Sequence, residues 1–393
     1  MKNILLIFLI SIILIGCTNK NMQYHLDMSK ASEDGIEIVV SNNLITDYSF
    51  VKSAKYVFLE NTVPIVSIDR LIIYNDTIII LDKKMQSVYL FSINGNYISE
   101  INKKGRGPGE YVNIDDFTVD NDIKEIVVLD RNSNKLLYYD FEGEFQKDID
   151  LGWRLFNKVA YFDFNFFLHN SSSNFYNKEQ CEFYTPLQKY DINSQGFIGY
   201  FPDGNTMSHI GVDNNAFFSN GDNLYYMDNW SYKIYRIDTT EISNIFTLNF
   251  QGNEKFHKNN KNISNINDLI DSNYIFDIKH ICVSEKFLSL CYIKNRKLYQ
   301  IVYDRNQGKT IFHSDSPIIV SAELLKKMII HYSYPQFCHN DDFISIIQPS
   351  TIKNMYANII VQDAPAEIST VLDKINNVDI NDNPILVFYK FDQ

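Results

Sequence analysis

Residues 78–96 read IIILDKKMQSVYLFSINGN, and residues 126–144 read IVVLDRNSNKLLYYDFEGE. Both segments contain an apolar run that ends in aspartate, five mostly polar residues, a second apolar run and a turn around a glycine. The second segment begins 48 residues after the first. Runs rich in isoleucine, valine, tyrosine and phenylalanine between Asn, Asp and Gly turns predict short β-strands. A period in the forties predicts a repeat architecture.

Further copies of this unit continue to the end of the chain. They lie in residues 166–191, 224–238, 287–304 and 343–391. Four antiparallel strands in roughly 40–50 residues are typical of one β-propeller blade. We therefore expect an all-β fold, a six-bladed β-propeller with short helical insertions. The sixth copy lacks one strand, and we expect residues 54–60 to supply it, so that the two ends of the chain close the ring.

Three segments have the apolar spacing of helices instead of strands. They are residues 265–271, 321–331 and 366–376. In the second of them, Ser321 is a suitable N-cap, and Leu324, Leu325, Met328 and Ile329 form one stripe. None is long enough to hold a core of its own, so we expect helical insertions on or between blades and no second domain.

The N-terminus predicts export. Lys2 precedes an apolar run from Ile4 to Ile15, which is shorter than the roughly 20 residues that span a bilayer. The residues Leu14-Ile15-Gly16-Cys17 resemble the lipobox of bacterial lipoproteins, in which the cysteine is acylated and becomes the new amino terminus. An ordinary signal peptide cleaved elsewhere is the alternative. We divide the chain into a lipoprotein signal peptide and lipobox (1–17), a tether and N-terminal extension (18–48) and the propeller domain (49–393).

The composition restricts the partners. Of 393 residues, 45% are apolar and 21% are charged, which is the composition of a folded protein with a large core. The formal net charge is -12, and lysine and arginine form no long run. Nucleic-acid binding is therefore disfavoured. The expected membrane contact is the lipid anchor alone.

Four cysteines follow Cys17: Cys181, Cys282, Cys291 and Cys338. Cys282 and Cys291 lie on the two arms of one predicted hairpin. This hairpin turns at Glu285–Lys286 and places Cys282 opposite Ser289. Cys291 is then a diagonal neighbour of Cys282, too far away for an easy disulfide. We expect free buried thiols, and no cysteine has the Cys-x-x-Cys spacing of a metal site.

Two segments carry a family resemblance. The segment from Leu81 to Ile98 is similar to the NHL-type propeller repeat, and Gly105-Arg106-Gly107-Pro108-Gly109-Glu110-Tyr111 looks like the signature of the six-bladed β-propeller lipoproteins abundant in Bacteroidetes. The resemblance covers about residues 50–391. It implies a propeller fold, export and a mostly uncharacterised role, and it supplies no catalytic residue. Thr18, and not aspartate, follows the lipobox cysteine, so the resemblance favours an outer-membrane lipoprotein. The side of the membrane that the protein faces stays open.

The glycine-rich signature is the first candidate site. It links the outer strand of one blade to the innermost strand of the next, so we expect it on the face where the central channel opens. Arg106, Glu110 and Tyr111 offer donors, an acceptor and an amphipathic ring there. The alternative is a structural turn whose charged residues pair with neighbouring blades. We add Trp153, His209 and Trp230 to the candidate binding surface, because the tryptophans can stack on a sugar as well as pack in the core.

Aspartates form the other two candidate sets. Asp82, Asp130 and Asp228 recur at the end of the second strand, so we expect them to accept backbone hydrogen bonds in the following loop. A second set precedes or begins innermost strands; its members are Asp69, Asp115, Asp116, Asp213 and Asp277. If these carboxylates converge at one channel mouth, their oxygens suit a hard cation such as Ca²⁺. The alternative is that they are separate, solvated strand-start residues.

Two function hypotheses follow. The histidines have no His-Glu-x-x-His spacing, Gly-x-Ser-x-Gly is absent, and we assign no catalytic residue. The first hypothesis is a lipid-anchored propeller that binds an envelope protein or a carbohydrate on its channel face. The second is a metal-dependent hydrolase or lactonase, in which a cation held by Asp69, Asp115 and Asp277 activates water.

Overall fold

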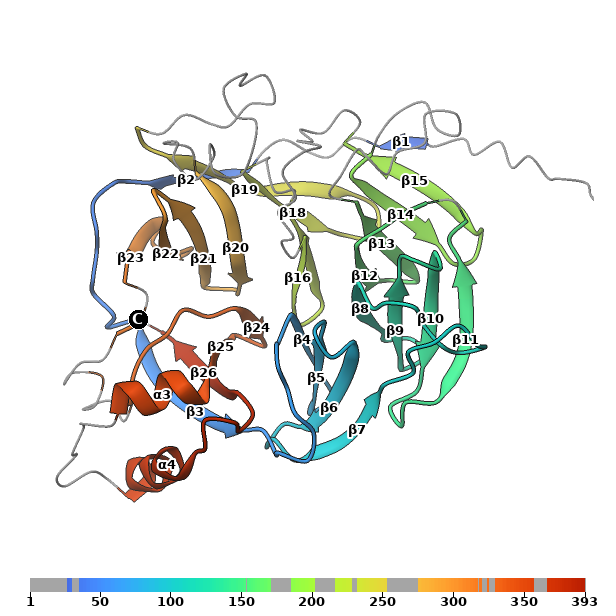
Figure 1. The fold of residues 1–393 in the computed structure, drawn as a ribbon. Helices are drawn as coiled ribbons and strands as arrows, with labels where there is room; N and C mark the ends of the chain where they lie inside the picture. Colours follow the sequence, from blue (N-terminus) through green and yellow to red (C-terminus); the bar gives the residue numbers. More distant parts are fainter. Residues whose placement is uncertain are drawn as a thin grey trace, which may run out of the picture.

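Six β-sheets are arranged as blades around a central axis (Figure 1). This confirms the predicted six-bladed β-propeller. The structure is a computed structural model that describes residues 27–29, 35–152, 154–170, 185–201, 216–227, 232–252, 275–316, 318–319, 324, 329–356 and 366–392.

The first three blades follow one another along the chain. Blade 1 consists of β4 (Arg70–Tyr74), β5 (Thr77–Asp82), β6 (Ser87–Ser92) and β7 (Tyr97–Ile101). Blade 2 consists of β8 (Asp116–Asp120), β9 (Glu125–Asp130), β10 (Lys135–Tyr139) and β11 (Phe145–Asp150). Blade 3 consists of β12 (Lys158–Phe162), β13 (Asn165–His169), β14 (Leu187–Asp191) and β15 (Gly196–Tyr200).

The remaining blades continue the ring. Blade 4 consists of β16 (Phe217–Asn220), β17 (Asn223–Tyr226), β18 (Lys233–Ile237) and β19 (Ile242–Phe250). Blade 5 consists of β20 (Phe276–Val283), β21 (Phe287–Lys294), β22 (Lys297–Asp304) and β23 (Lys309–Ser314). Blade 6 consists of β24 (Phe337–His339), β25 (Asp342–Ile347), β26 (Ile385–Phe391) and β3 (Val51–Phe58).

The continuous apolar run that opens the repeat is explained by burial on both faces of the sheet. In β5, Ile78 and Ile80 pack toward blade 6, whereas Ile79 and Leu81 pack toward blade 2. All four side chains are fully buried. A strand with one solvent-exposed face would alternate between apolar and polar residues. An unbroken apolar run therefore indicates a sheet that is covered on both faces. Each of the six junctions between neighbouring blades contains such an apolar cluster.

The predicted closing strand is present. β3 pairs antiparallel with β26, with Phe58 opposite Ile385, and forms the outermost strand of blade 6. The side chain of Asn383 strengthens this closure: its amide nitrogen donates to the backbone oxygens of Glu60 and Val63, both at 2.8 Å. The first and last parts of the propeller are therefore joined within one blade.

The range 18–48, which we expected to be a tether and extension, contributes strands of its own. β1 (Asp27–Ser29) pairs in parallel with β15 of blade 3, and β2 (Ile36–Val40) pairs in parallel with β19 of blade 4. An isolated bridge then joins Ile45 to His313 of blade 5. This N-terminal strap covers the outer edges of blades 3 and 4, which would otherwise present unpaired strand edges to solvent.

Two glycines at equivalent places fix how neighbouring blades approach each other. Gly95 and Gly143 lie in the turns before the outermost strands and have positive φ angles of 92° and 84°. A Cβ at Gly95 would lie 2.2 Å from the backbone oxygen of Phe58, and a Cβ at Gly143 would lie 2.4 Å from that of Glu100. The 48-residue spacing of these glycines therefore marks a repeated backbone contact between blades.

Helices are few and lie outside blade 6 (Figure 1). The predicted helix at 366–376 is present as α4 (Ala366–Asn377), and its Ile375 packs into the core. α3 (Pro349–Tyr356) was not predicted, although proline is favoured at a first helical position. The segments 265–271 and, except for Leu324, 321–328 fall outside the described residues. No helix of the described chain is long and apolar enough to span a bilayer.

The pairing of β20 with β21 confirms the hairpin predicted around Cys282 and Cys291. Cys282 lies opposite Ser289, and Cys282, Cys291 and Cys338 are all free thiols. Cys181 and the lipobox residue Cys17 lie outside the described residues.

Candidate functional site

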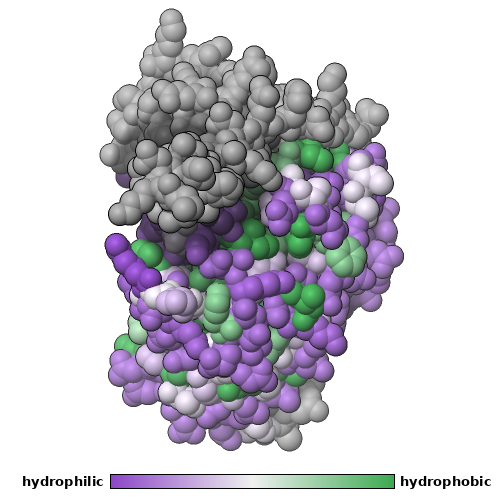
Figure 2. All heavy atoms as spheres, turned by 90° about the vertical axis from the view of Figure 1, so that its right-hand side faces the viewer, coloured by the Kyte–Doolittle hydropathy of each residue, from purple (hydrophilic) through white to green (hydrophobic). Residues whose placement is uncertain are grey.

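The six innermost strands surround a cavity of about 920 Å³ at the centre of the ring. Residues of β4, β8, β12, β16, β20 and β24 line it. An innermost strand has a neighbour on one side only, so its other edge offers backbone N–H and C=O groups to the channel. In the view of Figure 2, over blades 2 and 3, hydrophilic residues predominate and hydrophobic ones are scattered.

A buried ion pair holds the first three innermost strands together. Arg70 of β4 pairs with Asp116 of β8, and both side chains are buried. The same guanidinium donates to the backbone oxygen of Val159 on β12 at 2.9 Å, and Asp116 Oδ2 accepts the N–H of Val159 at 2.9 Å. Asp116 Oδ2 is thus engaged by an arginine and a backbone amide, and its role as a metal ligand stays a prediction.

The other candidate metal ligands also have local partners. Asp69 Oδ2 accepts the N–H of Lys83 at 2.8 Å, and Asp115 Oδ2 accepts the N–H of Arg131 at 3.2 Å. These equivalent contacts tie the start of an innermost strand to the next loop of its own blade. Burial raises the pKa of Asp115.

Asp277 forms an ion pair with Lys279 at 2.5 Å, while Asp213 lies outside the described residues. Within the described ranges, no three His, Cys, Asp or Glu side chains gather in an arrangement that could hold a metal ion. Asp69, Asp115 and Asp277 therefore each contact a group of their own blade, whereas Asp116 contacts blades 1 and 3.

The repeated aspartates at the end of the second strand have the predicted geometry. Asp82 and Asp130 are fully buried. Asp82 Oδ1 accepts the backbone N–H groups of Lys84 and Met85, and Asp130 Oδ1 accepts those of Asn132 and Ser133. The second oxygen of each accepts an N–H from the segment that enters the blade. Asp228 lies outside the described residues.

The glycine-rich loop is attached to the neighbouring blade and does not reach into the channel. Tyr111 is fully buried in the cluster between blades 1 and 2, and its hydroxyl donates to the backbone oxygen of Gln86 at 2.8 Å. Burial raises its pKa to about 12. The expectation that Tyr111 lies on the channel face is therefore wrong: this residue of the segment between β7 and β8 packs in the inter-blade core.

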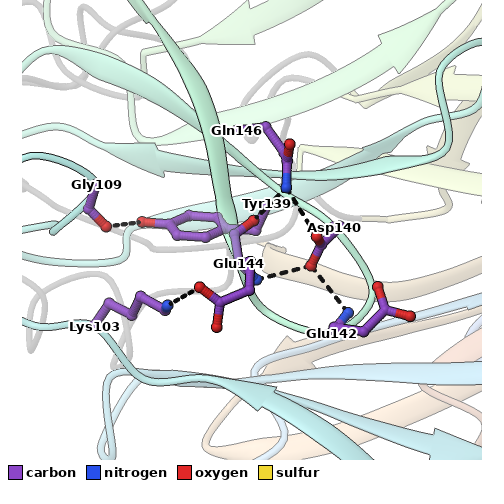
Figure 3. Close-up of polar contacts among 7 residues, drawn as sticks. All are labelled: Lys103, Gly109, Tyr139, Asp140, Glu142, Glu144 and Gln146. Atoms are coloured by element: carbon purple, nitrogen blue, oxygen red, sulfur yellow. Dashed lines mark hydrogen bonds and ion pairs between the residues drawn. The ribbon is translucent and has the colours of Figure 1, made fainter.

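The rest of this loop is organised around Glu110. Its carboxylate accepts the N–H of Gly107 at 2.7 Å, and a Cβ at Gly105 would lie 1.9 Å from it. Figure 3 shows two further attachments to blade 2: the hydroxyl of Tyr139 donates to the backbone oxygen of Gly109 at 3.1 Å, and Lys103 pairs with Glu144 at 3.0 Å. Arg106 is exposed to solvent. Gly109, with a φ of 73°, is required by its packing against Phe145 of blade 2, and Arg106 and Glu110 do not line the central cavity.

Three other candidates, Trp153, His209 and Trp230, lie outside the described residues.

A channel residue that sequence reasoning missed is His280 on β20. This strand has two irregularities in its pairing with β21, between Phe276 and Lys279 and between Lys279 and Cys282. Asp277 and His280 have positive φ angles of 51° and 54°. Non-glycine residues in this conformation are uncommon, and β-bulges frequently re-aim a side chain next to a functional site. His280 lines the cavity and packs against Tyr334 at 5.4 Å between ring centroids. A bulge cannot be read from the sequence, so no signal marked this residue.

Acidic residues surround one end of the cavity. The turns that follow β4, β8, β12 and β16 each place an aspartate in its lining: Asp76, Asp122, Asp163 and Asp222. The hydroxyl of Tyr161 donates to Asp122 within this group. An acidic rim repels anionic ligands and favours neutral or cationic ones.

His280 is expected to stay neutral far below the usual range of histidine. Burial and then the positive charge of Lys279 lower its pKa to about 4. In the unfolded chain its pKa is near 6.5, so below that value the unfolded state binds more protons and the folded state loses stability, by at most about 1.4 kcal/mol per pH unit between pH 6.5 and 4. NMR titration of the imidazole protons measures this pKa directly.

The matched variant is Lys279→Met, which removes the neighbouring positive charge and is expected to raise the pKa of His280. A titration near pH 6.5 in the unaltered protein would contradict the half-buried, cation-flanked environment.

The chain is similar to one protein family and to solved structures. A family model described as "Domain of unknown function (DUF4934)" matches residues 25–390. A solved "Putative exported protein" from Bacteroides fragilis is similar at a TM-score of 0.72 and 20% identity, over 92% of this chain and 100% of that one. A DUF4221 family member from Bacteroides vulgatus is similar at a TM-score of 0.45 and 11% identity, over 87% and 97%. No curated protein sequence matches the chain significantly.

Proposed function

We propose a binding role for this chain, which belongs to the family described as "Domain of unknown function (DUF4934)". In this proposal it is a lipid-anchored protein of the cell envelope, and it binds a small polar ligand, uncharged or positively charged, in the central channel. The observation that carries the proposal is the cavity of about 920 Å³ enclosed by the innermost strands. Ligand pockets are typically about 300–1,000 Å³.

The lining supports this ligand class. The cavity wall combines hydrogen-bonding groups, such as Asn121, Ser219 and His280, with the aromatic rings of Tyr74 and Phe218. Neutral hydroxyl-rich molecules are bound by such mixtures, since each hydroxyl finds a polar partner while the ring faces cover apolar carbons. The acidic rim disfavours an anionic ligand at its own end of the cavity, although Lys83, Lys158 and Lys279 also belong to the lining. A carbohydrate is the uncharged ligand that fits this description best.

The envelope location rests on two supports. The apolar N-terminal run followed by Gly16-Cys17 resembles a lipoprotein signal, and the similar Bacteroides fragilis protein is named as exported. We place the protein at the outer membrane on the lipobox resemblance. Metabolic labelling with a fatty-acid analogue tests the anchor, because label is expected on Cys17 and on no other residue.

A channel-blocking variant tests the binding role. Ser219 lines the cavity and is exposed, so Ser219→Trp is expected to fill part of the channel without disturbing the apolar clusters. Neutral oligosaccharides at 100 times their Kd stabilise a protein by about 2.7 kcal/mol, and we expect the resulting rise in the unfolding midpoint to disappear in the variant. Thermal melting of both proteins with a panel of neutral, cationic and anionic oligosaccharides gives the measurement.

The control is Glu142→Trp, which places the same side chain on an exposed turn of blade 2 (Figure 3). It is expected to bind as the unaltered protein does. Equal midpoint shifts in Ser219→Trp and the control would place the ligand outside the channel and refute the proposal.

A further inference from the structure

Two thiols from neighbouring blades lie at the same apolar cluster. Cys282 lies on β20 of blade 5, and Cys338 lies on β24 of blade 6. Cys282 is fully buried in the cluster between these blades, and Cys338 packs against that cluster. The sulfur of Cys338 lies 3.9 Å from the backbone oxygen of Val283, the residue that follows Cys282, and 3.7 Å from that of Ser219. The two cysteines are 56 residues apart in sequence, and the packing of blade 5 against blade 6 brings them together.

The two side chains pack together at the junction of blades 5 and 6. Burial first, and then the neighbouring thiol of Cys338, raise the pKa of Cys282. A disulfide requires that two cysteines face each other at short range, with Cα atoms about 4.4–6.8 Å apart. Cys338 packs against the cluster that contains Cys282, and its sulfur reaches the backbone of the adjacent residue Val283, so the two side chains lie at short range.

The two thiols differ in access. Cys338 is half-buried and lines the central cavity, whereas Cys282 has no exposed surface. A small reagent that enters the channel therefore reaches Cys338 first. Cys291, the remaining thiol of blade 5, is opposite Lys279 and is only a diagonal neighbour of Cys282 on the hairpin. It is the poorer partner on geometry.

We propose that Cys282 and Cys338 are an oxidisable pair that forms a disulfide between blades 5 and 6 by exchange with a small disulfide. The thiolate of Cys338 attacks one sulfur of that reagent, whose S–S bond breaks and releases a first thiolate. Cys282 then loses its proton and attacks the Cys338 sulfur of the mixed disulfide, which releases the second thiolate. Two protein thiols are oxidised, the reagent is reduced to two thiols, and the two protons pass to the released thiolates.

This pair is independent of the channel ligand proposed above. It matters in an oxidising compartment, where such bonds persist. The bond would link blade 5 to blade 6, the blade that closes the ring because it holds both β26 and β3. It would also place a covalent link in the channel wall beside Ser219.

Oxidised glutathione tests the proposal on the purified protein. After incubation, the remaining thiols are alkylated and the peptides are analysed by mass spectrometry. We expect a cross-linked peptide pair that contains Cys282 and Cys338, and a rise of several degrees in the unfolding midpoint that dithiothreitol reverses. A bond from Cys282 to Cys291, a bond from Cys338 to Cys181, or an unreactive Cys338 would each overturn it.

Two variants keep the result interpretable. Cys282→Ser is expected to stop the reaction after its first step, so that glutathione stays on Cys338. Cys291→Ser is expected to leave the cross-link unchanged. If Cys338 keeps glutathione in the unaltered protein as well, the two sulfurs do not meet and the inference is wrong.

Discussion

Replacing Asp116 by alanine is expected to lower the free energy of unfolding by about 3–5 kcal/mol. The substitution leaves the guanidinium of Arg70 buried without its carboxylate and removes the acceptor for the N–H of Val159. A buried charge that loses its only counter-ion must be desolvated without compensation, which is why breaking such a pair costs more than the pair contributes. Equilibrium denaturation in urea measures the loss.

The neighbouring carboxylate provides the matched control. Asp115 is half-buried and accepts one backbone N–H, from Arg131, at 3.2 Å. Asp115→Ala is expected to cost about 1 kcal/mol, the contribution of one such hydrogen bond. The double variant Arg70→Met/Asp116→Leu is expected to recover part of the stability lost in Asp116→Ala, since no charge is left buried. Equal losses for the two alanine variants would show that the ion pair does not clamp the three strands.

Gly95→Ala is expected to destabilise the propeller by about 3 kcal/mol. An L-residue at this φ of 92° is strained by roughly 1–2 kcal/mol. The added Cβ would also lie 2.2 Å from the backbone oxygen of Phe58, so the turn of blade 1 and β3 of blade 6 must move apart. Overpacking of this kind typically adds about 1–3 kcal/mol. Denaturation in guanidinium chloride gives the difference.

Gly152→Ala separates the backbone strain from the steric overpacking. Gly152 also has a positive φ, of 69°, but no atom lies within 4 Å of a Cβ built there. We expect a loss of roughly 1–2 kcal/mol from the backbone conformation alone. If Gly95→Ala cost no more than this control, the close approach of blades 1 and 6 would not determine the stability of the closure.

The fold could be predicted because the sequence repeats where the structure repeats. Ile78–Leu81 is apolar throughout since both faces of β5 are covered, and Asp82 recurs as Asp130 because each blade needs the same loop contacts. The closing strand at residues 54–60 could be predicted by counting strands. The NHL resemblance stays a resemblance, since the structure shows the blades and does not test that family.

The candidate site was harder to predict because its contacts join residues from different blades. Asp116 forms an ion pair with Arg70 and accepts the N–H of Val159, and neither contact has a local sequence signal. The conspicuous motif around Tyr111 was wrongly placed on the channel face, because an amphipathic ring in a glycine-rich loop can turn inward as easily as outward. His280 was missed because two bulges in β20, and not its sequence context, direct it to the channel.

The N-terminal strap has a consequence for how the protein is made. Strands β1, β2 and β3 are synthesised first, yet their partners β15, β19 and β26 follow much later, the last of them at residues 385–391. A ribosome or a translocation pore would therefore release the opening residues long before anything exists for them to pair with. Blades 1 and 2, whose strands are contiguous, can assemble early, whereas blade 6 must wait for the final strand. The last step of maturation is thus the pairing of β3, from the early part of the polypeptide, with β26 at its end.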